Sequence, residues 1–303
     1  MAYTFHTLDV FTDTRFAGNP LAVVLDADTL SSAQMQSIAR EFNLSETVFV
    51  LAAENPAHSA KVRIYTPSAE LPFAGHPTVG TAILLTMLKA QFASGDGDAL
   101  VVLEQGIGIV RVGVKLRPGQ LPYAEFDAPI LPELTGHLPG VERLAAAVGL
   151  LPNEIGFENH QPARSAAGNG FALIPVTTRE ALGKAQVNLA QWVPAFADAG
   201  VAGAFLYSRE CVHNTSAFHA RMFAPLHGMP EDPASGSAAI CLAGAIHHFD
   251  RAPDGIHRRI VEQGFAMSRP SYMTLTLCVR NARIETVRLG GPAIRVTSGT
   301  LEV

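Results

Sequence analysis

The sequence predicts an α/β chain made of two similar halves, each a curved, mostly antiparallel sheet wrapped round one buried helix. Two observations predict this class. The stretch 63–85 joins a short β-type run to a helix, and the same order of residue types returns at 221–246, about half a chain length later. Each half also has several strand patterns but only one helix that is apolar on nearly every face, and such a helix is buried.

The first half reads as short strands separated by turns. Tyr3, Phe5, Leu8 and Val10 alternate with polar residues, which predicts a strand. Ser31 or Ser32 is a good cap for a helix that runs to residue 42. Further elements are strands at 21–25, 47–51 and 60–65 and a hairpin of 99–103 with 108–115.

The second half is expected to repeat this order. Residues 123–127 are interpreted as its first strand, followed by strands at 171–176, 203–207 and 273–279, a helix-like segment at 189–197 and a last pair of strands from 282 to 303. The linker is placed near 118–122. The predicted domains are therefore 1–120 and 121–285, and the final strands, 286–303, can return to the first domain.

Composition argues against several classes of protein. The chain of 303 residues has a formal net charge of −5 and no basic block, so a nucleic acid is not an expected partner. Its apolar stretches are broken well short of the ~18 residues needed to span a bilayer, and the N-terminus lacks the pattern of a signal peptide. Three scattered cysteines are typical of a reducing compartment. We expect a cytoplasmic protein without a membrane partner.

The strongest physical signal lies at the starts of the two apolar helices, near Pro77 and Pro233. Helix N-termini carry exposed N–H groups and a positive dipole end, so two that meet would bind a carboxylate without a metal. His76 and Asp232, which precede these prolines, are interpreted as matching positions of the repeat that carry different polar groups. The plainer alternative is that Asp232 is a helix cap followed by Pro233 at the first helical position, and that His76 closes a turn.

Glu46 differs from the repeated features because it occurs only once. Its position in the second half is read as Ala202, whereas the Gly-Asn turns and the helix starts recur. A feature needed for folding should be needed twice, so a carboxylate present once is a candidate acid/base. Desolvation in a closed cleft would adapt it to that task. The plainer alternative is an exposed turn residue, and Ser45 beside it is read as a turn or cap residue rather than a nucleophile.

Other motifs are weak. The histidines have no spacing matched by carboxylates or thiols, so no metal site is expected. Ser235 lacks the Gly-x-Ser-x-Gly frame of a hydrolase. The Gly106–Gly108 segment is read as a hairpin turn because no strand-to-helix switch follows it.

Four segments together resemble the PhzF family of phenazine-biosynthesis-type isomerases: NLSETVF (43–49), ELPFAGHPT (70–78), EDPASGSA (231–238) and EQG…RPS (262–271). The resemblance covers nearly the whole chain and implies the diaminopimelate epimerase-like fold, no cofactor and often a homodimer. It implies that Glu46 shuttles a proton and that His76 and Asp232 act beside it. The remaining residues of the expected substrate site are Ser45, Gly75, Pro77, Thr78, Ser235, Gly236 and Ser237.

The chain departs from related epimerases and proline racemases, which use a cysteine at each helix start. Neither helix start has one here, so proton transfer by a single carboxylate is favoured over racemisation by two thiols. The expected function is a cofactor-independent, biosynthetic isomerase that moves a proton on a small carboxylate-bearing substrate, such as an amino acid or a cyclic or aromatic acid. Two alternatives stay open: a ligand-binding protein without turnover, and a hydrolase or lyase that uses Ser235 or Ser237.

Overall fold

The chain forms two compact units in the computed structural model, which describes residues 1–92, 95–197 and 199–303. The first unit comprises Met1–Pro129 with Gly290–Val303, and the second comprises Ile130–Leu289. The last strand, β17 (Arg283–Glu302), contributes to both units because it runs through the boundary at residue 289. Among the described residues, no helix is long and apolar enough to cross a membrane.

The first unit is a closed barrel around one helix. Strand β17 pairs with β1 and with β8, and the remaining pairings β1–β2, β2–β3, β3–β4, β4–β6, β6–β7 and β7–β8 complete the circuit. Strands β2 and β3 are parallel, as are β4 and β6. The bounds are β1 Ala2–Val10, β2 Asn19–Val24, α1 Ser32–Phe42, β3 Glu46–Leu51, β4 Ala60–Tyr65, β5 Glu70–Leu71, α2 Gly75–Leu88, β6 Gly97–Gln105, β7 Gly108–Leu116 and β8 Tyr123–Asp127.

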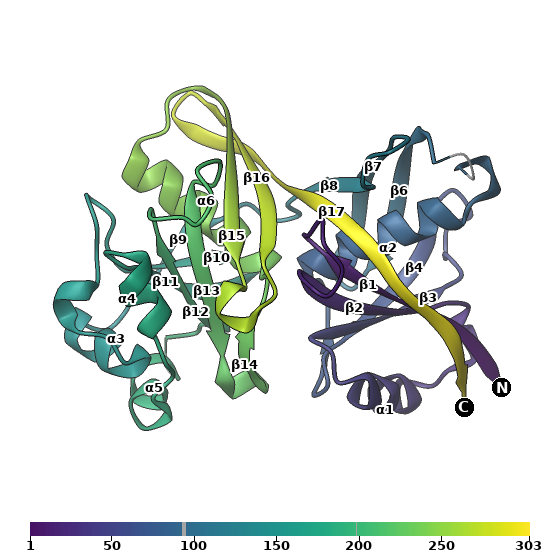
Figure 1. The fold of residues 1–303 in the computed structure, drawn as a ribbon, viewed down its shortest axis with the longest axis horizontal. Coiled ribbons are helices and arrows are strands. Elements are labelled where there is room, and N and C mark those ends of the chain that lie inside the picture. The colour runs from purple at the N-terminus through teal and green to yellow at the C-terminus, as the bar shows by residue number, and fades with distance from the viewer. Residues whose placement is uncertain (93–94, 198) are drawn as a thin grey trace. The chain divides into compact units, whose positions relative to one another are not determined.

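Helix α2 fills the interior of this barrel. Its residues from 75 to 84 are all buried, and it contacts β1, β2, β3, β6, β7 and β8 (Figure 1). Gly80 permits the close approach, because a Cβ atom there would lie 2.6 Å from the Leu21 side chain and 2.8 Å from that of Val10. The amphipathic helix α1 packs elsewhere, with Met35 and Ile38 in a cluster that includes Phe49. Ser31 caps α1 as predicted, in a capping box with Gln34.

The second unit repeats the pairing order of the first. Strands β10–β11 are antiparallel, β11–β12 parallel, β12–β13 antiparallel, β13–β15 parallel and β15–β16 antiparallel. Helix α6 is buried from residue 238 to 246 and contacts β9, β10, β11 and β16. The bounds are β9 Glu133–Leu134, α3 Val141–Val148, β10 Ala163–Ala167, β11 Asn169–Pro175, α4 Arg179–Lys184, α5 Leu189–Phe196, β12 Gly203–Ser208, β13 Phe218–Ala224, β14 Met229–Asp232, α6 Gly236–Asp250, β15 Gly255–Gln263 and β16 Ser271–Arg280.

Helices α3 and α5 cover a second core in this unit. Trp192 and Phe196 of α5 pack with Leu144 of α3 and with Ile174 and Leu206 from the strands. Short 3-10 helices complete the chain at Ala27–Thr29, Ala90–Phe92, Pro152–Glu154, Pro225–His227 and Phe265–Met267. The predicted fold class, two pseudo-symmetric α/β halves with a sheet round a central helix, is therefore confirmed.

One predicted strand has a different place. Residues 123–127 were expected to open the second half, but they form β8, which pairs antiparallel with β7 in the first unit. The segment near residues 118–122 is the turn between β7 and β8, so it is not the linker. The second unit begins at Ile130 rather than at residue 121. The C-terminal segment that belongs to the first unit begins at Gly290 rather than at residue 286.

Each unit has a buried glutamate that holds the equivalent loop through hydrogen bonds from the loop's backbone. Glu104 at the end of β6 accepts hydrogen bonds from the backbone N–H groups of Glu54 and Asn55 at 2.8 and 2.9 Å. Glu262 of β15 accepts them from Val212 and from His213. These carboxylates belong to the scaffold, because they recur in both units.

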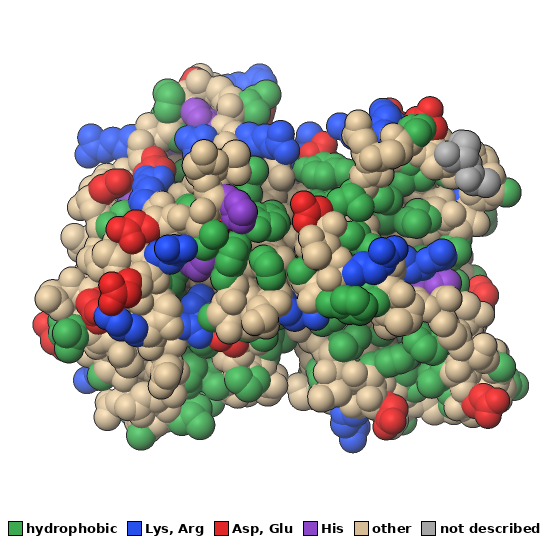
Figure 2. Space-filling model, in the orientation of Figure 1, with side chains coloured by type: hydrophobic (Ala, Val, Ile, Leu, Met, Phe, Trp, Pro, Cys, Tyr) green, Lys and Arg blue, Asp and Glu red, His purple; other side chains and the backbone are tan. Residues whose placement is uncertain are grey.

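On the face drawn in Figure 2, basic and acidic side chains lie interspersed over each unit.

Candidate active site

In the first unit, Glu46 and His76 meet at the end of the barrel where α2 begins. Glu46 opens β3, and its backbone lies opposite Leu21 of β2. His76 is the second residue of α2. The Nε2 atom of His76 lies 3.3 Å from Oε2 of Glu46, and the two residues are only 3% and 7% exposed. The carboxylate that occurs once in the repeat is therefore buried against a histidine rather than exposed in a turn.

The histidine of this pair is neutral at ordinary pH. Burial lowers the pKa of His76 to about 3, against the effect of a hydrogen bond to the backbone of Pro20. That bond leaves Nε2, the atom next to Glu46, with a lone pair rather than a hydrogen. The contact therefore places an uncharged ring, rather than a cation, beside the Glu46 side chain.

The first turn of α2 lacks a side-chain cap from its N-cap residue. The N-cap residue Ala74 supplies no side-chain hydrogen bond to the turn, so the N–H groups of Gly75 and His76 begin the helix without a side-chain cap. Pro77, the third helical residue, has no N–H to satisfy. The Thr78 hydroxyl donates to the Ala74 carbonyl at 2.8 Å and accepts from Gln105 at 2.9 Å. Thr78 therefore supports the turn from within.

In the second unit, Gln263 holds the segment that leads into α6. Its Nε2 atom donates to the Asp232 carbonyl at 2.6 Å, and its Oε1 atom accepts from the Ser235 N–H at 3.2 Å. Asp232 is the last residue of β14 and is 5% exposed. Ser235 is the buried N-cap of α6, Gly236 is its first residue, and Ser237 is half-buried. This turn, too, has no side-chain cap from its N-cap residue.

A glycine follows that glutamine and lets the next loop approach the same segment. Gly264 has a φ of +81°, and a Cβ atom there would lie 2.6 Å from the Pro233 carbonyl oxygen. Gly106 follows Gln105 in the same way, and its Cβ atom would lie 2.9 Å from the Cα atom of Pro72. The Gln-Gly pair at the end of β6 and of β15 is thus a repeated support for the two helix starts.

Two equivalent ion pairs show which residues of the two units correspond in the segments before α2 and α6. Arg63 of β4 makes a bidentate pair with Glu70 of β5 at 2.7 and 2.6 Å. Arg221 of β13 makes the same bidentate pair with Glu231 of β14, at 2.8 Å for each bond. The residues after these glutamates correspond one by one up to the helices, and both helices begin five residues after the glutamate.

This correspondence corrects two expectations about the helix starts. Asp232 matches Leu71, and His76 matches Ser237, so the prediction that His76 and Asp232 occupy equivalent positions was wrong. The alternative that Asp232 caps the helix with Pro233 at its first position was also wrong, because the N-cap is Ser235. Both errors arose because Pro233 was matched to Pro77, whereas its counterpart is Pro72.

The residue of the second unit that corresponds to Glu46 also differs by one position from the predicted one, but the conclusion about Glu46 is unchanged. Glu46 lies opposite Leu21 at the start of β3, as Gly203 lies opposite Phe171 at the start of β12. The matching residue is therefore Gly203 rather than Ala202. Neither is acidic, so Glu46 remains a carboxylate that the repeat contains once.

The serines do not form a nucleophilic site within their own units. Ser45 is half-buried in the bend before β3. In the described part of the second unit, no histidine is bonded to the hydroxyl of Ser235 or Ser237. Each half-site is thus built around a helix start, with Glu46 and His76 in one and Asp232 in the other.

Three supporting residues escaped prediction: Pro20, Gln105 and Gln263. Pro20 was read only as part of a turn, and its bond to the ring of His76 depends on a contact between distant segments. A signal for the two glutamines was present in the sequence, because a Gln-Gly pair ends the equivalent strand in each half.

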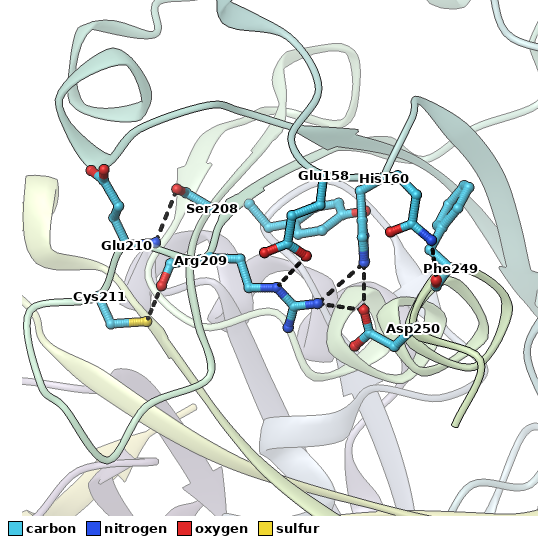
Figure 3. A network of polar contacts seen from close by, with 10 residues as sticks. Glu158, His160, Ser208, Arg209, Glu210, Cys211, Phe249 and Asp250 are labelled. Atoms are coloured by element: carbon cyan, nitrogen blue, oxygen red, sulfur yellow. Dashed lines mark hydrogen bonds and ion pairs between the residues drawn. The ribbon is translucent and has the colours of Figure 1, made fainter. Parts of the chain in front are cut away.

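A second buried polar network lies at the other end of α6 (Figure 3). His160 contacts the Tyr207 hydroxyl at 2.9 Å through Nδ1 and Asp250 at 2.8 Å through Nε2. Arg209 also bonds to Asp250, the last residue of α6. Because Ser235 begins this helix, the network is remote from the half-site of its unit. We interpret it as a structural network that stabilises the C-terminus of α6.

A groove of about 1030 Å³ in the first unit is also distinct from the half-site. Its charged lining residues pair with one another, as in the contacts of Lys61 with Glu54 and of His58 with Glu104. Neither Glu46 nor His76 lines it.

Comparison with known proteins gives one consistent family. The family model described as phenazine biosynthesis-like protein, PhzC-PhzF, matches residues 8–299. An uncharacterized isomerase of Mesorhizobium japonicum is 48% identical over 97% of this chain and 96% of its own. A trans-2,3-dihydro-3-hydroxyanthranilate isomerase of Pseudomonas chlororaphis is 33% identical, with 97% of each chain covered. A PhzF-family crystal structure from Bacillus anthracis has a TM-score of 0.88 at 23% identity over the whole of both chains.

Proposed function

The chain belongs to the phenazine biosynthesis-like PhzC-PhzF family of isomerases, and from this premise we propose that it moves a proton between two carbon atoms of a small carboxylate-bearing substrate, with Glu46 as the acid/base. One observation carries the proposal. The carboxylate that the repeat contains once is buried 3.3 Å from the lone-pair nitrogen of His76. A buried carboxylate beside a polar side chain is a setting in which enzymes place a general base.

The substrate carboxylate is proposed to bind at the helix starts. The first turn of α2 supplies the N–H groups of Gly75 and His76, and the first turn of α6 supplies those of Gly236 and Ser237. Such turns attract anions through their N–H groups and dipole. Asp232 is proposed to bind the polar substituents of the substrate.

The proton transfer needs no partner beyond the substrate. Glu46 in its carboxylate form takes a proton from an sp³ carbon, and the electron pair of that C–H bond moves into the adjacent conjugated system. The acid form of Glu46 then gives a proton to another carbon of that system. Atoms and charge balance, because the same carboxylate is regenerated. The proposed step uses only these side chains and therefore invokes no metal or cofactor.

The proposal is tested by turnover in D₂O. The first compound to try is the one in the name of the Pseudomonas chlororaphis relative, trans-2,3-dihydro-3-hydroxyanthranilate, followed by other amino, cyclic and aromatic acids. We expect conversion to an isomer of the same mass in H₂O and incorporation of deuterium at a ring carbon in D₂O. A protein that binds such acids but exchanges no hydrogen would contradict the proposal and favour a ligand-binding role.

A further inference from the structure

The connection between β1 and β2 is a feature that the first unit has and the second lacks. Residues 11–18 link these strands, whereas Gly168 alone links the equivalent strands β10 and β11. The remaining strand pairings correspond between the units, so a long connection is not needed to build this fold. By the reasoning that singled out Glu46, an addition present once is a candidate for function.

This connection lies at the same end of the barrel as Glu46 and His76. Strand β1 ends at Val10, and β2 begins antiparallel to it at Asn19. Strand β3 runs parallel to β2 and begins with Glu46 at the same level, opposite Leu21. Between them, Pro20 of β2 is bonded to the ring of His76. Residues 11–18 therefore emerge beside the half-site.

Within this connection, Phe16 is held in an unusual conformation with its ring in solvent. Its φ angle of +67° lies in the left-handed region, which bulky residues rarely adopt. Its N–H donates at 2.6 Å to Oδ2 of Asp9, a carboxylate that is 4% exposed and lies opposite Pro20. Phe16 itself is 72% exposed. A buried carboxyl group thus fixes a strained turn that presents an aromatic side chain, and strain of this kind is concentrated at functional sites.

The second unit offers a contrasting phenylalanine. Phe265 lies in the loop after β15, at the equivalent end of its own unit. Its ring is 5.1 Å from that of His219 and 6.1 Å from that of Tyr272, measured between centroids. Phe265 is thus half-buried against neighbouring rings of its own unit, whereas Phe16 keeps most of its surface available.

We propose that Phe16 is a substrate-contacting residue that packs against the planar ring, or the equivalent apolar body, of the carboxylate substrate. The inference rests on the proposed function and deepens it. The start of α2 binds the carboxylate, and Phe16 selects acids that carry a flat apolar ring over small aliphatic acids. Aromatic side chains supply large contact area of this kind.

The test measures binding of 3-hydroxyanthranilate, a fully aromatic analogue with no hydrogen to transfer from an sp³ ring carbon, by titration calorimetry. Phe16→Ala removes the ring, and Phe16→Gly removes it while suiting the left-handed backbone, so the glycine variant should fold at least as well as the native protein. We expect each variant to bind the probe about tenfold more weakly. Ile256→Ala, at a residue that is 76% exposed on β15, is the control and should bind normally.

The inference would be overturned if both Phe16 variants bound the probe within about twofold of the native protein. It would also be overturned if both variants lost the fold, because the ring would then be structural. Failure of the native protein to bind the probe would overturn it as well. The proposed function fails by a different measurement, hydrogen exchange catalysed without the carboxylate of Glu46, so the two failures are distinguishable.

Discussion

The Nε2 atom of His76 stands 3.3 Å from the Oε2 atom of Glu46 inside the first unit, and the ring is bonded on its other side to the backbone of Pro20. The contact joins the start of β3 to the start of α2. It places the uncharged ring of His76 against the Glu46 side chain, because burial lowers the pKa of His76.

The neutrality of His76 predicts a pH dependence of stability. Because the pKa of His76 is about 3 in the folded protein and 6.5 for an ordinary histidine, the unfolded chain binds one more proton between these values. This residue should therefore lower the free energy of unfolding by about 1.4 kcal/mol per pH unit as the pH falls below about 6.5. Urea unfolding at pH 7, 6, 5 and 4 should show a shallower loss for His76→Gln than for the native protein. Parallel curves would mean that His76 titrates normally.

The two glutamines predict unequal costs of the same substitution. Gln263→Leu leaves both the Asp232 carbonyl and the Ser235 N–H without a partner in buried surroundings, so it should cost about 2–4 kcal/mol of stability. Gln105→Leu, the matched control, removes one bond, to Thr78, and should cost about 1 kcal/mol. Denaturant unfolding of both variants measures the difference. Equal costs would argue against the role given to Gln263.

The network at the C-terminus of α6 should affect stability but not chemistry. His160→Ala removes bonds to Tyr207 and Asp250 and leaves a cavity, so a loss of about 3 kcal/mol is expected. Because the network is at the opposite end of α6 from Ser235, kcat per folded molecule should stay within about twofold. A larger fall in kcat for protein that is shown to be folded would place His160 in the mechanism.

Substitution of Asp232 should lower turnover but leave stability nearly unchanged. Asp232→Asn keeps the size of the side chain and the backbone carbonyl that Gln263 holds, so the variant should keep the fold. If the carboxylate contacts the substrate, kcat should fall about 100-fold, and the melting temperature should change little. Normal turnover in this variant would remove Asp232 from the site.

Much of the fold is predictable from local patterns. Residues 79–88 are apolar on nearly every face, which predicts a helix buried on all sides, and α2 occupies the interior of the barrel. Ser31 predicts the start of α1 because a cap depends on residues within one turn. Glu46 is recognisable because the repeat supplies its own comparison.

The remaining features depend on contacts between distant segments. Pro77 and Pro233 follow similar residues, and only the pairing of β5 with β4 and of β14 with β13 shows that Pro233 matches Pro72. The alternation at 123–127 predicts a strand but cannot name its partner, which is β7. The contact of His76 with Glu46 joins two motifs that the sequence separates.

The most direct test of the central claim is the rate of hydrogen exchange into substrate by Glu46→Gln, compared with the native protein in D₂O. Glutamine keeps the size of the side chain and cannot take up the proton. We expect normal folding, retained binding of 3-hydroxyanthranilate and an exchange rate at least about 1,000-fold lower. Exchange at a rate close to that of the native protein would contradict the assignment of Glu46 as the acid/base.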